Sequence, residues 1–170
     1  MIYCCDVTLP VCISFYGRHI CSSFESCLKT GCEVYLKTEA MKTFIIDDDP
    51  ISSFLTEAVL QMEDFSEQIV TFSSAEESLS FLNENMETNV PEVIFLDLNM
   101  PSMNGWQFLQ ALSPHENTFS KNCSIFILTS SIDSSEQKLA KEHTVVKGFI
   151  SKPITEEHIH FIKQGLGLVA

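Results

Sequence analysis

The stretch Val93-Ile94-Phe95-Leu96-Asp97-Leu98-Asn99-Met100-Pro101-Ser102-Met103-Asn104-Gly105 decides the fold of this chain. Four apolar residues lead to one carboxylate, Asp97, and a loop rich in Pro, Asn and Gly follows at once. Such a run predicts a strand that is buried on both faces, as in a parallel sheet. Ligands of open α/β sheets gather at the carboxyl ends of strands, although Asp is also a common turn residue. The role of Asp97 therefore depends on what the other strands bring to the same edge.

Four further apolar runs predict the remaining strands of such a sheet, at residues 43–46, 68–72, 124–128 and 148–151. Helical patterns lie between and after these runs. Asp49 followed by Pro50 predicts the start of the first helix, because Asp caps helices and Pro suits their first position. Apolar residues then recur at helical spacing, namely Ile51, Phe54, Leu55, Val59 and Met62.

The later helices have similar signals. The next is expected to begin at a capping box around Ser74, another at Asn104, a fourth to cover 133–143, and the last to be capped by Thr155. Their expected inward residues are Leu79, Leu82, Met86, Trp106, Leu109, Leu112, Ile159, Ile162 and Leu166. Residues 113–122 are expected to form a polar loop.

Strands thus alternate with helices five times, which predicts an α/β fold of the (βα)5 type. The parallel five-stranded sheet should be covered by helices on both faces, as a three-layer sandwich. The flavodoxin-like strand order 2-1-3-4-5 is the expected arrangement.

Composition narrows the classes of function. A chain of 170 residues is long enough for one domain with a proper core. The formal charge of −13 argues against a nucleic-acid surface, which needs a basic patch. No apolar run approaches the roughly 18 residues of a membrane span. The charge is compatible with a soluble cytoplasmic protein, or with one that holds a cation in an acidic site. We expect a cytoplasmic protein without nucleic-acid or membrane partners.

Residues 1–40 differ from the rest, because they contain six of the seven cysteines. We expect a domain boundary near Met41, with 1–40 a poorly ordered cysteine-rich extension and 41–170 the folded domain. A disulfide framework, a zinc site and an export signal are the alternatives. The missing C-x-x-C pair and the missing positive region before the apolar run argue against the last two.

In the predicted sheet, strand ends bring Asp47, Asp48, Asp97, Thr129 and Lys152 to one edge. Two carboxylates about 4 Å apart repel by roughly 4 kcal/mol at an effective dielectric near 20, so three together favour a bound cation. Mg²⁺ with oxygen ligands is the natural choice. A carboxylate, a metal, a lysine and a hydroxyl make a phosphoryl-transfer site, in which Asp97 attacks phosphorus.

These residues resemble the receiver domain of bacterial two-component response regulators, a CheY-like domain. The matching motifs are residues 45–50, 95–105, 128–130 and 151–153, and the resemblance extends from Met41 to about Gly167. Each motif alone is weak, but four in this order and at these spacings are highly specific.

The resemblance implies that Asp97 is the phosphoacceptor and becomes a 4-aspartylphosphate. Asp47 and Asp48 are implied as the acidic pair that holds Mg²⁺ together with Asp97. Asp48 would bind the metal directly, Asp47 through water, and Asn99 through its backbone carbonyl.

Three further positions take roles from the same resemblance. Thr129 would be the switch hydroxyl, Lys152 the phosphate-pairing lysine, and the Lys152–Pro153 peptide bond cis. Phe149 occupies the switch aromatic position, which is often Tyr in the family. Without a hydroxyl, Phe149 can signal only by burial or exposure.

Only one helix is predicted after Lys152, so the expected function is that of a stand-alone receiver in a phosphorelay. It would accept phosphate from a histidine kinase or histidine phosphotransfer protein and catalyse only its own phosphorylation and dephosphorylation. It would then change the surface of its fourth helix, fifth strand and fifth helix for an unknown downstream protein, or pass the phosphate on, as a monomer or a phosphorylation-dependent dimer.

Two rival functions share part of this pattern. A receiver-like module that binds partners without phosphorylation remains open, although the complete set of acids, Thr129 and Lys152 argues against it. An aspartyl-phosphate phosphatase of the haloacid dehalogenase type would need a second Asp two residues after Asp97, where Asn99 stands.

Overall fold

The computed structural model describes residues 41–85, 90–115, 119, 122–130 and 134–168. The predicted extension over 1–40 lies outside the described residues, as do Met86 and Asp133. The boundary near Met41 and the character of the extension therefore stay predictions. Within the described ranges, no helix is both long and apolar enough to cross a membrane.

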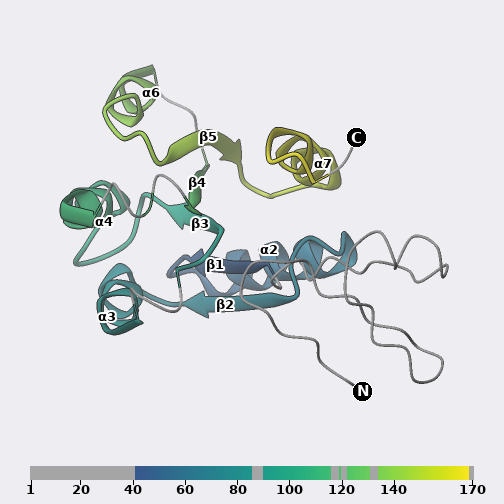
Figure 1. Ribbon diagram of the computed structural model, residues 1–170, viewed down its shortest axis with the longest axis horizontal. Coiled ribbons are helices and arrows are strands. Elements are labelled where there is room, and N and C mark those ends of the chain that lie inside the picture. The colour runs from purple at the N-terminus through teal and green to yellow at the C-terminus, as the bar shows by residue number, and fades with distance from the viewer. Residues whose placement is uncertain (1–40, 86–89, 116–118, 120–121, 131–133, 169–170) are drawn as a thin grey trace, which may run out of the picture. The chain divides into compact units, whose positions relative to one another are not determined.

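Five parallel strands form one sheet in the order β2-β1-β3-β4-β5 (Figure 1). The strands are β1 (Lys42–Ile46), β2 (Gln68–Phe72), β3 (Val93–Asp97), β4 (Ser124–Thr129) and β5 (Val146–Ser151). This is the predicted flavodoxin-like order, so the sequence prediction of the sheet is confirmed.

Helices cover both faces of the sheet. The helices are α2 (Pro50–Met62), α3 (Ala75–Asn85), α4 (Gly105–Leu112), α6 (Ser134–Ala140) and α7 (Glu156–Gly165), with a 3₁₀ turn η1 (Ser113–His115). Figure 1 shows α2 and α7 on one face, and α3, α4 and α6 on the other. The result is the expected three-layer sandwich.

Alternate strand residues build two hydrophobic cores, because successive side chains of a strand point to opposite faces. Ile94 and Leu96 of β3 pack in the core beneath α3, α4 and α6. Val93 and Phe95 of the same strand pack in the core beneath α2 and α7. All five residues of β3 are buried, as expected of a central strand covered on both faces.

The predicted helix starts at the site edge are confirmed. The Asp49 carboxylate accepts a hydrogen bond from the backbone N–H of Ile51 at 2.9 Å, and Pro50 is the first residue of α2. Asn104 and Gln107 form a reciprocal capping box at the start of α4. Such caps satisfy N–H groups that have no partner within the helix.

Most of the apolar residues whose spacing predicted α2 lie outside its buried face, although Val59 is partly buried and packs against the core. Ile51 and Phe54 are each 69% exposed, and Met62 is 81% exposed. The buried residues of this helix are Ser53, Thr56 and Leu60. The spacing therefore predicted the helix correctly but not the side that meets the sheet.

Other differences lie on the far side of the sheet. Phe119 is fully buried in the core, so the prediction of a polar loop over 113–122 was wrong at this residue. Helix α6 ends at Ala140, three residues earlier than predicted. The N–H of His143 donates a hydrogen bond to the carbonyl of Ala140 at 3.0 Å. Strand β5 begins at Val146, two residues earlier than predicted.

Gly105 holds the loop after Asp97 against the end of β3. Its N–H donates to the carbonyl of Leu98 at 3.1 Å. A Cβ atom at this position would lie only 2.6 Å from the backbone oxygen of Asp97 and 2.9 Å from Cδ2 of Leu98. The close approach of α4 to the strand end therefore requires glycine here.

We predict that Gly105→Ala lowers the free energy of unfolding by about 1–3 kcal/mol, the usual range for overpacking. The clash is with backbone, which cannot rotate away, and the gain of about 1 kcal/mol in helix propensity is smaller. Urea denaturation measures the change. Gly165→Ala, in the last turn of α7 with open space around it, is the matched control and should be neutral or slightly stabilising. Equal stability of the two variants would contradict the argument.

Candidate functional site

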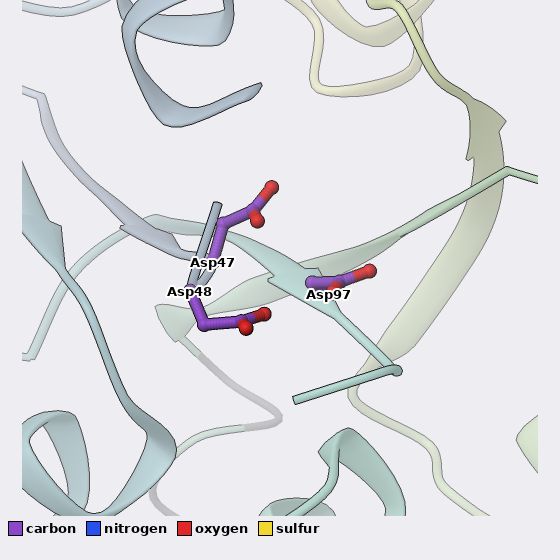
Figure 2. Close-up of side chains that lie close together, drawn as sticks. All are labelled: Asp47, Asp48 and Asp97. Carbon is purple, nitrogen blue, oxygen red and sulfur yellow. The ribbon is translucent and has the colours of Figure 1, made fainter. Parts of the chain in front are cut away.

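The three predicted acids meet at the carboxyl edge of the sheet. Asp47 and Asp48 directly follow β1, and Asp97 is the last residue of the neighbouring strand β3. One carboxylate oxygen of each lies within 4.8 Å of the others. Figure 2 shows the three side chains close together, with their carboxylates pointing the same way. The parallel register thus produces the acidic cluster that the sequence predicted.

The three acids differ in burial. Asp47 is 2% exposed and Asp97 is 5% exposed, whereas Asp48 is exposed. Two buried carboxylates at this distance need partners that offset their charge. The cluster is open to solvent on the side of Asp48.

Hydrogen bonds from three groups hold the Asp47 carboxylate. Oδ1 accepts from the backbone N–H of Asp49 at 3.0 Å. Oδ2 accepts from the hydroxyl of Ser52 at 2.6 Å and from Nζ of Lys152 at 2.7 Å. Sequence reasoning missed Ser52, although a hydroxyl in the first turn of the helix that follows the acids was the available signal.

Lys152 bridges the two buried acids from the end of β5. Its Nζ lies 2.7 Å from Oδ2 of Asp47 and 3.2 Å from Oδ1 of Asp97. Burial lowers the pKa of Lys152, but the hydrogen bond and charge of Asp47, together with those of Asp97, outweigh this effect. The pKa of Lys152 is therefore raised above its ordinary value, and the ammonium stays charged.

The Asp97 carboxyl has a pKa above its ordinary value. Burial is the largest cause and the charge of Asp47 adds to it. The charge and hydrogen bond of Lys152 and the N–H of Asn99 lower the pKa but do not cancel the rise. Ionised Asp97 is thus held at a cost in free energy, because its environment favours the neutral form.

Thr129 and Lys152 are connected through the backbone of adjacent strands. Asp97 pairs with Leu128 in the register of β3 and β4, so Thr129 extends one residue further. Thr129 is buried, and its carbonyl accepts from the N–H of Lys152 at 2.9 Å. The Lys152–Pro153 peptide bond is cis. The predicted hydroxyl residue, Thr129, and the predicted lysine, Lys152, therefore lie next to each other at the ends of β4 and β5.

Phe149 lies on β5 opposite Ile127 of β4. Its ring is half-buried and packs against the core beneath α3, α4 and α6. The residue is therefore placed between the core and the surface, on the strand that leads to Lys152.

The chemistry of this donor set fits a hard divalent cation. The carboxylates of Asp47, Asp48 and Asp97 and one ammonium leave two negative charges in excess when all are ionised. Oxygen ligands with one side open to solvent suit Mg²⁺, which binds a few carboxylates and keeps several waters. Asn99 follows Asp97 by two residues and is exposed.

Comparison with known proteins connects this edge to a family. Residues 43–162 match the family model described as the response regulator receiver domain. The chain is 29% identical over 119 residues to a probable chemotaxis protein CheY of Rhizobium etli, covering 70% of this chain and 86% of that protein. It is 24% identical over 119 residues to the transcriptional regulatory protein BtsR of Salmonella typhi. That match covers 70% of this chain but spans less than half, 45%, of BtsR.

A solved structure gives the same result for the fold. The crystal structure of a two-component response regulator from Cytophaga hutchinsonii superposes with a TM-score of 0.70 at 27% identity. The superposition covers 76% of this chain and 98% of that one.

We predict that Asp97→Asn raises the free energy of unfolding at neutral pH in metal-free buffer, by on the order of 1 kcal/mol. The raised pKa of Asp97 means that the ionised form costs stability above the folded-state pKa. This cost disappears as pH falls through that pKa toward the unfolded value, so the difference from the parent should vanish in acid. Urea denaturation at both pH values measures it. A variant less stable than the parent at neutral pH would show that the partners of Asp97 outweigh its desolvation.

Proposed function

Because the chain belongs to the response regulator receiver domain family of two-component systems, we propose that Asp97 accepts a phosphoryl group and switches the domain between two states. The observation that carries the proposal is the cluster of Asp47, Asp48 and Asp97 with Lys152 between the two buried acids. The donor would be a histidine kinase or a histidine phosphotransfer protein.

The chemical step needs no protein base. An ionised carboxylate oxygen of Asp97 attacks the phosphorus of a phosphohistidine in the donor protein. A P–O bond forms to Asp97 while the P–N bond breaks, and its electron pair stays on the imidazole nitrogen of the donor.

Positive charge at the edge would balance the incoming phosphoryl group. Mg²⁺ would be bound by Asp48 directly, by Asp47 through water, and by Asp97. The backbone carbonyl of Asn99 would be a further ligand. When bound, Mg²⁺ supplies charge neutralisation at the acids and at the phosphoryl oxygens. Lys152 supplies a second positive charge from the end of β5.

Lys152 and Thr129 would carry the switch. Lys152 is closer to Asp47 than to Asp97, so added charge on Asp97 would draw the ammonium toward the phosphoryl group. The Thr129 hydroxyl would donate to a phosphoryl oxygen, and Phe149 would move further into the core. The affected surface is that of α6, β5 and α7, which would bind a downstream protein or form a phosphorylation-dependent dimer.

In this proposal, the protein is a cytoplasmic signalling receiver that catalyses only its own phosphorylation and dephosphorylation. One observation favours a second function, partner binding without phosphorylation. Ile51 and Phe54 expose apolar surface at the start of α2, next to the acidic edge, and Met62 exposes more at the far end of the helix. A partner could dock on this surface without phosphorylation.

We predict that incubation with acetyl phosphate and Mg²⁺ adds one phosphoryl group, detected by intact mass. Asp97→Asn should reduce the modified fraction to background, and chelation of Mg²⁺ should do the same. Asp49→Asn is the matched control, because it removes the adjacent charge while Asn caps α2 equally well. It should keep the modification.

Two results would overturn this assignment. Modification that persists in Asp97→Asn would place the phosphoryl group elsewhere. No modification of the parent, with a phosphorylated histidine kinase also supplied, would favour the phosphorylation-independent function.

A further inference from the structure

One oxygen atom of Asp47 receives two donors of different kinds. Oδ2 accepts from the neutral hydroxyl of Ser52 at 2.6 Å and from the charged ammonium of Lys152 at 2.7 Å. The Asp47 side chain is fully buried, so these donors replace the water that an exposed carboxylate would have. The hydroxyl oxygen and the ammonium nitrogen therefore lie at nearly the same distance from Oδ2.

Helix α2 is oriented so that its first turn holds Asp47 twice. The Ser52 hydroxyl bonds to the side chain, and the hydroxyl of the next residue, Ser53, bonds to the backbone oxygen at 3.1 Å. This orientation turns polar residues inward and leaves Ile51 and Phe54 exposed. The contact with Asp47 therefore accompanies an arrangement that apolar burial alone would not favour.

A divalent cation at the acids changes the two donors unequally. The ammonium of Lys152 competes with the cation for the same carboxylates and is repelled by it. The Ser52 hydroxyl carries no net charge, so it can keep its bond to Oδ2 while the cation binds. Among the described residues, Ser52 is the donor to this oxygen that the cation does not repel.

We propose that Ser52 is a positioning residue for the metal-bound state of the acidic edge. Its hydroxyl keeps the buried Oδ2 of Asp47 satisfied when Lys152 moves away toward Asp97. Without that hydroxyl, cation binding leaves Oδ2 with one donor fewer or requires Lys152 to stay beside the cation. Either outcome weakens binding. This inference rests on the proposed function only in requiring Mg²⁺ at the acids.

The test is titration calorimetry of Mg²⁺ into the purified full-length protein. Ser52→Ala should raise the Mg²⁺ dissociation constant about five- to tenfold, the net contribution of about one ordinary hydrogen bond. Ser52→Thr keeps a hydroxyl and should restore the affinity to within about twofold. Ser80→Ala, an exposed serine of α3, is the matched control and should bind Mg²⁺ like the parent.

Two further readouts separate positioning from a structural role. The rise in melting temperature on adding Mg²⁺ should be smaller for Ser52→Ala than for the parent, each rise being measured from that protein's own melting temperature without Mg²⁺. With acetyl phosphate, Ser52→Ala should need more Mg²⁺ for half-maximal phosphorylation and reach the parent rate at saturation.

Three results would overturn the inference. They are unchanged or tighter Mg²⁺ binding by Ser52→Ala, failure of Ser52→Thr to restore it, and absence of Mg²⁺ binding by the parent. A parent that binds Mg²⁺ but takes no phosphoryl group from acetyl phosphate or a histidine kinase would overturn the proposed function instead. The calorimetric comparison of Ser52 variants would still decide the inference in that case.

Discussion

Repulsion among the carboxylates at the ends of β1 and β3 is the constraint on which the rest of this structure depends. Asp47 and Asp97 are buried side chains of like charge, and Asp48 lies beside them at the solvent. Burial of unpaired charge is among the costliest arrangements in proteins. The ammonium of Lys152, on the far strand β5, offsets this charge by contacting both buried acids. The edge thus holds an excess of negative charge that a divalent cation can reduce further.

The packing of the sheet and helices places these residues at one edge. Two cores, built from alternate residues of the same strands, fix the sheet between two layers of helices. Gly105 then brings α4 against the end of β3, where a side chain would meet the backbone of Asp97. Burial of apolar side chains therefore offsets the free-energy cost of the crowded acidic edge. The site itself lies where the helices begin.

Helix α2 shows how the site and the core make opposing demands. Its polar residues Ser53 and Thr56 face inward, and Ile51 and Phe54 face solvent. Hydrogen bonds from Ser52 and Ser53 to Asp47 accompany this orientation. Apolar spacing predicted a helix here, because a 3.6-residue period indicates a helix. The spacing could not show whether hydrogen bonds to Asp47 or burial of apolar side chains would set the orientation of that helix. With the observed orientation, α2 has apolar side chains at its surface.

Local signals in the sequence determined the five strands, the order of elements and the residues at the strand ends, because apolar runs and caps act over a few neighbours. They also placed Asp47, Asp97 and Lys152 at one edge, since parallel strands share it. Only the tertiary structure decided which groups bond there. The contact between Lys152 and Asp47 joins residues more than a hundred positions apart, and the burial of Phe119 depends on a core that its polar neighbours do not reveal. Contacts of this kind are set by three-dimensional packing and electrostatics, which no local pattern encodes.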